Sequence, residues 1–571
     1  MKLKIKYTIP LAIVLVAGSC KKNLDINHDP DNPTSLPISK ILPTVERNLG
    51  LALSMGPSWT NDYGNPSGGL GMQLETYVHR TTQRGTPPDQ YTVSGTDFYM
   101  QAGWTDMYGL VLNNTERIIA DGTAAGNMQY VGIAKIIKAY AFSQLVDVFG
   151  DIPFSEANRL DSSIRYPKFD DDATIYPKLI ALLNEAITDL NNTTALNLNK
   201  PRTDDVIYGG NVARWIKAAN TIKLKLYTQE RKVKNVQAEV TALLSNPSGL
   251  ISATNESFQL PFGPNGATDD RNPGFGDYYA TQRSNHVSPW FYEILKGYNN
   301  NILKTNPDPR LPYYIFNQIR TTTVTADPTE YRDGAFVSLY FGSRGPNRDR
   351  NQQNVISLMG IYPVGGRYDD GAGGTAGATS GTGAAPYRFI TYADRLYLEA
   401  ELISAGVITG DARAVLQAAM TESFKQVDYV ITTYVKPAQS VPTVNGTAAA
   451  TTYVNKALTE YDAGSAAKKL ELIMTEKWLQ GYGSEVDAYT DYRRTGYPVL
   501  FDPNNPAMAP GGFVQPPVNG NPQVSPQPAV RVQLSRPYPN SLPWFQTELE
   551  TNPNAPPQKD IINSFKVFWM P

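Results

Sequence analysis

The stretch KIIKAYAFSQLVDVFGDIPFSEA, residues 135–157, contains the pattern that decides the fold. From Ile133 to Phe149, apolar residues recur at intervals of three and four, which places them on one face of an α-helix. We therefore predict a helix with one buried face. Gly150 can end this helix, because a residue without a Cβ readily adopts the left-handed conformation, and Pro153 prevents the helix from resuming. A buried helix that runs into a turn is typical of a helical core and by itself indicates no function.

The composition limits the classes of function. The 571 residues include 51 Lys and Arg and 53 Asp and Glu, for a net charge of −2. A chain without a broad positive field is not expected to bind nucleic acid. The chain has 34 Tyr and 7 Trp, and aromatic rings with a polar edge suit a surface that both packs and hydrogen-bonds, although ordinary packing is the alternative. The 45 Gly and 43 Pro predict long loops between helices.

The first residues form a targeting segment. Three lysines precede an apolar run at 9–16, and three small residues lead into Cys20. This order is that of a secretory signal peptide, which we assign to residues 1–19, because the apolar run is too short to span a bilayer. Cys20 is the only cysteine, so no intramolecular disulfide is possible, and its position after a cleavage site predicts lipid attachment. Residues 20–40, rich in Pro, Asp and Asn, are predicted to be an extended lipidated tether.

Helical patterns recur through the rest of the chain. They occur at 42–53, 175–190, 211–227, 392–402, 412–424 and 468–481. The fourth and fifth are separated by a short turn and predict an antiparallel pair, the unit of helical repeats, although the tetratricopeptide W-x2-L-G-x2-Y signature is absent. Lys225 lies beside the apolar stripe of the third pattern. The acidic run 170–172 is interpreted as a helix cap; a calcium site is the alternative, but the spacing of an EF-hand loop is missing.

Turn residues dominate between about 253 and 386, which we interpret as a loop-rich insertion. Within it, 365–385 is so rich in Gly, Ala, Thr and Ser that a mobile loop is predicted. Trp104 and Tyr108, four residues apart, are assigned to the core. Five other aromatic residues are selected as candidates for ligand contact, with plain packing as the alternative for each: Trp59, Tyr63, Tyr91, Trp290 and Tyr298.

Several stretches carry a resemblance to a known family. They are F-G-D-I-P-F-S-E-A at 149–157, W-I-K-A-A-N-T-I-K-L-K-L at 215–226, D-P-R-L-P-Y-Y at 308–314 and D-Y-R-R-T-G-Y-P at 491–498. In these sequence motifs the chain resembles the SusD/RagB family of nutrient-binding outer-membrane lipoproteins, the surface partners of TonB-dependent transporters. The residues A-G-S-C before and at Cys20 resemble a lipobox. Asp487-Ala488-Tyr489 departs from the Glu-Ala-Trp that the family typically carries there, and Leu542 stands where an acid is common.

The resemblance implies a mainly α-helical fold, with a SusD-like, tetratricopeptide-like helical-repeat scaffold and long loops with minor β elements on the ligand face. Residues 41–571 would form a single domain. The protein would be lipid-anchored at the outer membrane and exposed on the cell surface, as the lid of a TonB-dependent, SusC-like transporter that imports oligosaccharides. A peptide ligand is the alternative, because some family members carry peptides.

Two further questions concern charged groups and catalysis. Arg493 and Arg494 could grip an anionic ligand, but an internal ion pair with Asp491 or Glu485 is favoured. The three histidines are scattered, and no H-E-x-x-H, G-x-S-x-G, P-loop or C-x-x-C pattern occurs, so we expect no catalytic residue, no metal and no cofactor. Two other classes of protein are the alternatives to a binding protein: a secreted glycoside hydrolase that works with two carboxylates, and a purely structural surface protein.

Overall fold

The computed structural model describes most of the chain. It covers residues 36–55, 69–83, 91, 94–96, 103–159, 162–263, 270–280, 283, 285–323, 330–343, 354–484, 486–502 and 537–571. The predicted signal peptide, Cys20, Trp59 and Tyr63 lie outside these ranges, so the predictions made for them stay predictions. No helix among the described residues is both long enough and apolar enough to cross a membrane.

Helices make up the body of the molecule, and the predicted mainly α-helical fold is confirmed. The long helices are α2 (Ile38–Leu53), α5 (Asn113–Ala124), α6 (Met128–Phe149), α7 (Asp172–Leu190), α8 (Val212–Glu230), α14 (Tyr392–Ser404), α15 (Ala412–Tyr429), α16 (Ala448–Ala463), α17 (Ala466–Gln480) and α18 (Val486–Thr495). The shorter ones are α3 (Gly71–Tyr77), α9 (Gln237–Leu244), α10 (Pro273–Phe275), α11 (Pro289–Leu295), α12 (Leu311–Tyr314), α13 (Ile361–Val364) and α19 (Gln546–Thr551). Single turns of other helix types are η2 (Asp106–Leu112), η4 (Pro247–Gly249), η5 (Thr254–Glu256), η6 (Gly276–Ala280) and η7 (Val430–Val435).

The strands of the described chain are short and pair two by two, always antiparallel. The pairs are β1 (Thr81–Gln83) with β5 (Asn285–Val287), β2 (Ile152–Pro153) with β3 (Phe169–Asp170), β4 (Phe258–Leu260) with β10 (Tyr387–Ile390), β6 (Ile315–Phe316) with β9 (Leu358–Met359), and β7 (Tyr331–Asp333) with β8 (Phe336–Ser338). Ribbons this small do not form a core of their own. They therefore serve to shape loops on the helical body.

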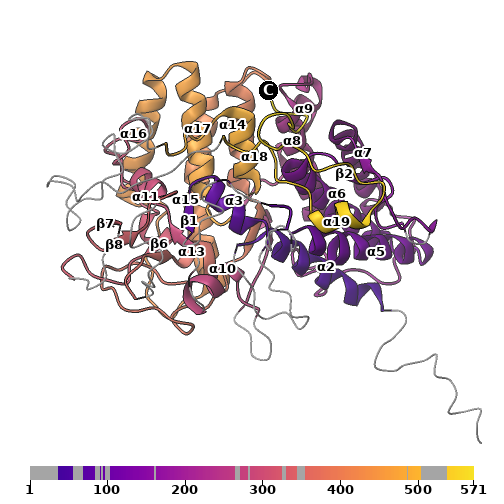
Figure 1. Cartoon of the computed structure of the whole chain (residues 1–571), viewed down its shortest axis with the longest axis horizontal. Coiled ribbons are helices and arrows are strands. Elements are labelled where there is room, and N and C mark those ends of the chain that lie inside the picture. Colours follow the sequence, from indigo (N-terminus) through magenta and orange to yellow (C-terminus); the bar gives the residue numbers. More distant parts are fainter. Residues whose placement is uncertain are drawn as a thin grey trace, which may run out of the picture.

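The helices form two groups that lie side by side (Figure 1). Helices α5 to α8 form the group at the right, and α14 to α17 form the group at the left of the centre, with α14, α16 and α17 at the top. The strands β6, β7 and β8 lie at the lower left, with the helix α11 above them. Every helix predicted from a pattern is present, and α14 and α15 pack against each other as the predicted pair. Helix α2 begins at Ile38, which lies within residues 20–40, the range predicted for the tether.

Helix α6 is more deeply buried than its pattern predicts. Of its 22 residues, 18 are buried, and from Ala139 to Phe149 every side is covered. The prediction of one buried face is wrong because α6 contacts α2, α5, α7, α8 and α18 around its circumference. The predicted end is confirmed, since Gly150 has φ of 71° and follows the last helical residue. Helix α6 is therefore the central helix of its group, and the other helices pack around it.

A buried carboxylate near the end of α6 joins several elements. Asp147 is fully buried and accepts hydrogen bonds from the hydroxyl of Tyr176 on α7, from Gln229 on α8 at 2.9 Å and from the indole of Trp569 at 3.2 Å. The ammonium of Lys225 lies 3.6 Å from the same carboxylate. Burial raises the pKa of Asp147, and the charge of Lys225 opposes that rise. One side chain therefore holds α6, α7, α8 and the C-terminal residues together.

The two arginines of the D-Y-R-R-T-G-Y-P stretch are part of the interior. Arg493 donates to the backbone oxygen of Asp147, and Arg494 forms ion pairs of 2.7 Å with both Glu401 and Asp491. A second guanidinium, that of Arg231, lies 2.8 Å from Glu401. The interpretation of an internal ion pair is confirmed for Asp491, while Glu401 on α14 is a partner that the sequence did not reveal. These contacts tie α18 to both helix groups.

Two smaller predictions concern the acidic run and the Gly-rich segment. Asp171 caps α7, because its carboxylate accepts from the backbone N–H of Ala173 at 3.1 Å. Residues 365–385 contain no regular element, yet Ala376 hydrogen-bonds through its N–H to Gln318 and through its oxygen to Arg283. Such anchors argue against the mobility that the composition suggested.

Replacing Asp147 tests its role as the junction of the helices. Asp147→Ala leaves three hydrogen-bond donors without this acceptor, while Lys225 keeps a second carboxylate, that of Asp487, at 2.7 Å. Leaving buried donors unsatisfied costs about 1–3 kcal/mol. We expect a loss of that size in the free energy of unfolding, measured by urea denaturation. Asp121→Ala removes an exposed partner of Arg117 and is expected to cost less than about 1 kcal/mol. Equal losses in the two variants would contradict the assignment.

The pH dependence of stability tests the second buried cluster. Burial alone would raise the pKa of Glu401, but Arg494 and Arg231 lower it to about 2. Since the folded pKa lies below the unfolded value of 4.5, the stabilisation is complete above pH 4.5 and is lost as the pH falls towards 2. We therefore expect the stability gap between the wild type and Glu401→Gln to narrow over this interval.

Urea unfolding of both chains between pH 6 and pH 2.5 measures this gap. Glu185→Gln is the control, because the side chain of Glu185 is 61% exposed where it pairs with Lys135. A gap for Glu401→Gln that stays constant over the whole range would show that the carboxylate is not held in its charged form by the arginines.

Candidate functional site

An open cleft lies among the short strands β6, β7 and β8, which Figure 1 shows at the lower left. Its walls come from α11 and the turn after it, from α12 and β6, from the β7–β8 hairpin, and from residues 369 and 371 of the Gly-rich segment. The cavity volume is about 460 Å³. Binding sites for small molecules typically enclose about 300–1,000 Å³, so the cleft has the size of a ligand site.

Aromatic rings form one wall of the cleft. The rings of Tyr292 and Phe336 stack face to face, with centroids 3.8 Å apart and planes 3° from parallel. Tyr298, in the turn after α11, lines the same cleft and is 37% exposed. The ammonium of Lys296 lies 5.9 Å from the ring centre of Tyr292 and 5.6 Å from that of Tyr298. Lys296 makes no ion pair within the described part of the chain.

A carboxylate lies beside the two tyrosines of this wall. Asp333, the last residue of β7, accepts from the hydroxyl of Tyr292 at 2.7 Å, and its charge acts on the phenol of Tyr298. Burial, with a contribution from the charge of Asp333, raises the pKa of Tyr298 to about 12. Both phenols therefore stay neutral at physiological pH, and the hydrogen bond to Asp333 orients Tyr292.

The opposite side of the cleft is polar. Asp369 accepts from the side-chain amide of Asn317 at 2.6 Å and from the N–H of Gly371 at 3.0 Å. The side-chain oxygen of Asn317 in turn accepts from Ser357 at 2.6 Å. This chain of hydrogen bonds fixes the start of the Gly-rich segment beside the cleft.

Another acid lies behind the aromatic wall. Glu293 is buried and accepts from the hydroxyl of Tyr331 at 2.7 Å, while its second carboxylate oxygen has no hydrogen-bond partner among the described residues. Burial raises the pKa of Glu293 to about 8. Because Glu293 does not line the cleft, it supports the wall and does not face a ligand.

The structure places the sequence-selected aromatics in different surroundings. Tyr298 lies in the cleft, whereas Trp290 is only 4% exposed and its indole donates to the backbone oxygen of Val499 at 3.2 Å. Tyr91 is also buried, and its hydroxyl lies 2.7 Å from a ring nitrogen of His79. The contacts of Tyr91 and Trp290 are those of packed interior residues, the alternative to ligand contact given above. Their roles in ligand binding stay predictions.

Of the residues that line the cleft, only Tyr298 was selected from the sequence, and three of the others carried a local signal. Tyr292 and Lys296 stand four apart in a short helical pattern, and Asp333 begins an Asp-Gly pair that is typical of a hairpin. These signals were present, but nothing in the sequence indicated that the hairpin would face the end of α11. The predicted core pair, Trp104 and Tyr108, is confirmed by ring centres 5.0 Å apart.

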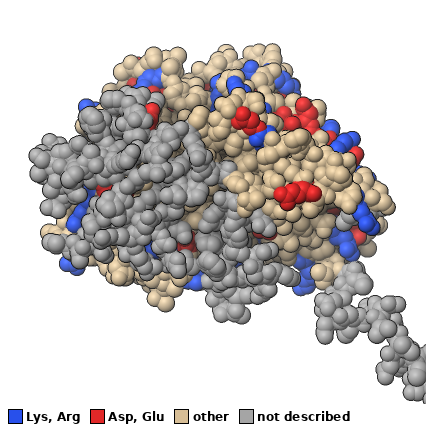
Figure 2. All heavy atoms as spheres, viewed as in Figure 1, with Lys and Arg blue, Asp and Glu red and all other residues tan. Residues whose placement is uncertain are grey.

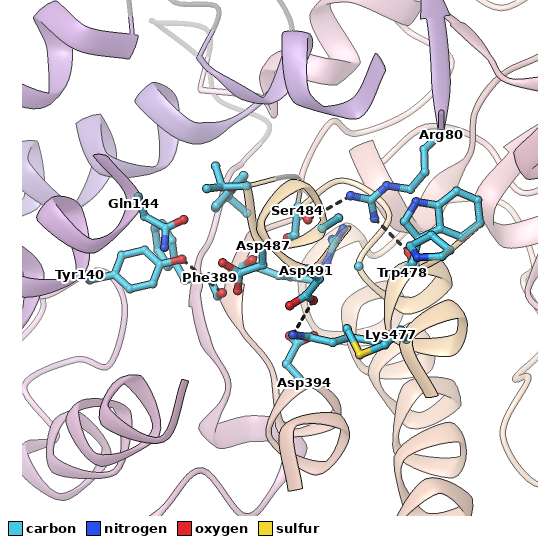
Figure 3. A pocket seen from close by; sticks show the side chains of 17 residues that line it. Arg80, Tyr140, Gln144, Phe389, Asp394, Lys477, Trp478, Ser484, Asp487 and Asp491 are labelled. Carbon is cyan, nitrogen blue, oxygen red and sulfur yellow. Dashed lines mark hydrogen bonds and ion pairs between the residues drawn. The ribbon is translucent and has the colours of Figure 1, made fainter. Parts of the chain in front are cut away.

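A smaller cavity lies in the interior, where α6, β10, α17 and α18 meet (Figure 3). Its volume is about 30 Å³, roughly the space of one water molecule. Figure 3 shows its charged side chains turned towards partners: Lys477 pairs with Asp491 at 2.8 Å, and Arg80 donates to the backbone oxygens of Trp478 and Ser484. This cavity is too small for a nutrient, so the open cleft is the candidate ligand site.

Charge is distributed evenly over the described surface in view. Lys and Arg are interspersed with Asp and Glu over the helices in Figure 2, and no broad patch of one sign covers them. On this described face, the chain therefore lacks the extended positive surface that nucleic-acid binding requires.

Comparisons with solved structures identify the fold. The chain is similar to a SusD homologue from Bacteroides fragilis, with a TM-score of 0.62 and 17% identity over 91% of this chain and 94% of that one. It is similar to a SusD homologue from Bacteroides uniformis, with a TM-score of 0.59 and 17% identity over 93% and 99% of the two chains. A SusD homologue from Flavobacterium johnsoniae, described as chitin-binding, matches with a TM-score of 0.58 and 19% identity over 81% and 87%.

Sequence comparison leads to the same family. Among curated proteins, none matches the chain. A family model described as "Starch-binding associating with outer membrane" matches residues 57–516, which is most of the chain. With this match and the shared helical fold, the chain belongs to the SusD-like family.

Proposed function

We propose that the protein is a nutrient-binding lipoprotein of the cell surface that captures oligosaccharides as the lid of a TonB-dependent, SusC-like transporter in the outer membrane. The lipid on Cys20 would anchor it, and residues beyond Cys20 would tether the body to the membrane. The single observation that carries this proposal is the cleft with an exposed tyrosine, a stacked aromatic pair and fixed polar groups. Membership of a family described as starch-binding supports the choice of ligand.

The chemistry of the cleft favours a sugar over a peptide. A sugar ring presents flat C–H faces to aromatic rings and hydroxyl groups to polar side chains, and the cleft offers both kinds of partner. Tyr298 supplies an accessible ring, and Lys296, Asn317 and Thr321 supply polar groups. The chitin-binding description of one similar structure is consistent with this choice. A peptide remains the alternative ligand for the same architecture.

Binding without cleavage is the second part of the proposal. A glycoside hydrolase needs one carboxyl group as an acid and another as a base or nucleophile. The two carboxylates that line the cleft, those of Asp333 and Asp369, already accept hydrogen bonds from protein donors at 2.6–3.0 Å. Groups engaged in this way suit the positioning of neighbours better than proton transfer to a substrate. We therefore propose no catalytic residue.

Truncation of the exposed tyrosine tests the ligand site. Tyr298→Ala removes the most accessible ring of the cleft, and truncation of a central aromatic contact commonly costs more than about 1 kcal/mol of binding free energy. We expect about tenfold weaker binding of an oligosaccharide that the wild type binds, measured by calorimetric titration. Tyr429→Ala is the control, because Tyr429 is half-buried on α15 and does not line the cleft. Unchanged affinity in Tyr298→Ala would contradict the placement of the site.

The anchor is tested separately from the ligand site. Cys20 is the only cysteine, so Cys20→Ser removes the only thiol that could carry a lipid. We expect the variant to lose incorporation of labelled palmitate and to move from the membrane fraction to the soluble fraction. A variant that stays labelled and membrane-bound would refute lipidation at this residue, whatever the protein binds.

A further inference from the structure

We propose that three exposed leucines near the end of α5, Leu36, Leu196 and Leu198, enter the hydrocarbon boundary of the membrane that carries the anchor. These three residues are called the leucine patch below. The contact rests on the proposed attachment through Cys20 and adds a second point at which the body meets the lipid. It leaves the cleft free, because Figure 1 shows α5 at the right and the strands of the cleft, β6, β7 and β8, at the lower left.

The leucine patch contains the three most exposed large apolar side chains of the described residues. Leu198 is 81% exposed, Leu196 is 70% exposed and Leu36 is 51% exposed. Single apolar side chains scattered over a surface are normal in proteins, whereas a group of them at one place marks a surface that meets an apolar partner.

Leu196 and Leu198 are directed outward by the residue between them. Asn197 is buried and has φ of 42°, a left-handed conformation that asparagine adopts more readily than most residues. Its N–H donates to the backbone oxygen of Gly126 at 3.0 Å, and its side-chain oxygen accepts from the N–H of Gln129 at 3.1 Å, at the start of α6. Because these bonds already fix the backbone, a bilayer that receives the two leucines does not have to order the loop first.

The start of the body lies at the same end of α5. The Cδ1 atom of Ile38, the first residue of α2, lies 3.9 Å from the position that a Cβ on Gly122 would take. The Cβ atom of Leu196 lies 3.3 Å from the corresponding position on Gly126, four residues further along. Leu36 precedes Ile38 by two residues. The leucine patch therefore lies where the chain that comes from Cys20 enters the body.

This position selects the membrane as the partner of the patch. Leu36 follows Cys20 by only 16 residues, and an extended chain spans at most about 3.6 Å per residue. An anchor at Cys20 therefore keeps the patch within about 58 Å of the lipid, which raises the local concentration of the patch at the bilayer. Transfer of leucine side chains from water to hydrocarbon is favourable, so a weak contact of this kind suffices once the chain is attached.

The charged residues that follow the patch are compatible with this contact. Lys200 and Arg202 are exposed, and long basic side chains at a bilayer surface reach the headgroups with their charged ends. Asp204 is half-buried, and its carboxylate accepts from the hydroxyl of Tyr130 at 2.6 Å and from the N–H of Arg202 at 2.9 Å. The nearest acid in the sequence is therefore engaged by the protein.

A fluorescent label at residue 198 tests the contact. Cys20→Ser leaves no cysteine, so Leu198→Cys in that chain provides a single thiol for a nitrobenzoxadiazole label. A hexahistidine tag in front of residue 20 holds this mature chain on phosphatidylcholine vesicles that contain a nickel-chelating lipid. Phosphatidylcholine with a nitroxide on its acyl chain quenches a label that enters the bilayer. We expect at least twofold quenching of the label at residue 198.

Matched variants make the result specific. The same label on Val233→Cys is expected to show no quenching, because Val233 is 50% exposed but lies in the turn after α8. Leu196→Asp is expected to abolish the quenching at residue 198, because a carboxylate does not enter hydrocarbon. Val233→Asp is expected to leave that quenching unchanged. Circular dichroism of each variant confirms that it is folded.

Two results would overturn the inference directly: equal quenching at residues 198 and 233, or quenching at residue 198 that persists in Leu196→Asp. Emission that shifts to the blue at residue 198 without quenching by the nitroxide lipid would assign the patch to a second copy of the chain, and would overturn the inference as well. Because the tag supplies the attachment, neither a failure of lipidation at Cys20 nor a failure of ligand capture changes the outcome.

Discussion

The helical body depends on the hydrogen bonds that the buried carboxylate of Asp147 accepts. This carboxylate lies in the interior, where an isolated charge is costly, and it is tolerated because donors from α7, α8 and the C-terminal residues converge on it. Arg493 from α18 reaches the backbone oxygen of the same residue. Elements far apart in the sequence are therefore fixed relative to α6 by the need to satisfy one buried group. A core held together in this way has little freedom to rearrange, which suits a scaffold that must present loops in a constant position.

The candidate cleft is built on this scaffold from parts that have little regular structure of their own. A short helix, a two-stranded hairpin and a Gly-rich segment meet there, and hydrogen bonds to Asp333 and Asp369 set the positions of the side chains. Loops can vary without disturbing the helices beneath them, so such a surface is a natural place for ligand specificity. The separation between a rigid body and a loop-built face is consistent with a family that binds different nutrients with one fold.

The sequence predicted the fold better than the site, for physical reasons. Helix periodicity and the glycine after Phe149 are local signals, and they predicted the helices and the end of α6. Long-range pairing leaves no such signal: Lys225 lies beside an apolar stripe in the sequence, yet it is buried between Asp487 at 2.7 Å and Asp147 at 3.6 Å. Tyr298, one of the five aromatics selected from the sequence, lines the cleft, but its neighbours Asp333 and Phe336 come from a hairpin that is distant in the sequence. Trp290 lies only eight residues away and packs inward, a difference that depends on tertiary contacts alone.

The central claim is that this SusD-like protein captures an oligosaccharide and does not cleave it. Calorimetric titration of the mature protein against a panel of oligosaccharides and oligopeptides, with each mixture then analysed for cleavage products, tests this most directly. The account predicts saturable binding of at least one oligosaccharide that is recovered intact. Release of shortened products would contradict it in favour of a hydrolase, and binding confined to the peptides would contradict the proposed ligand class.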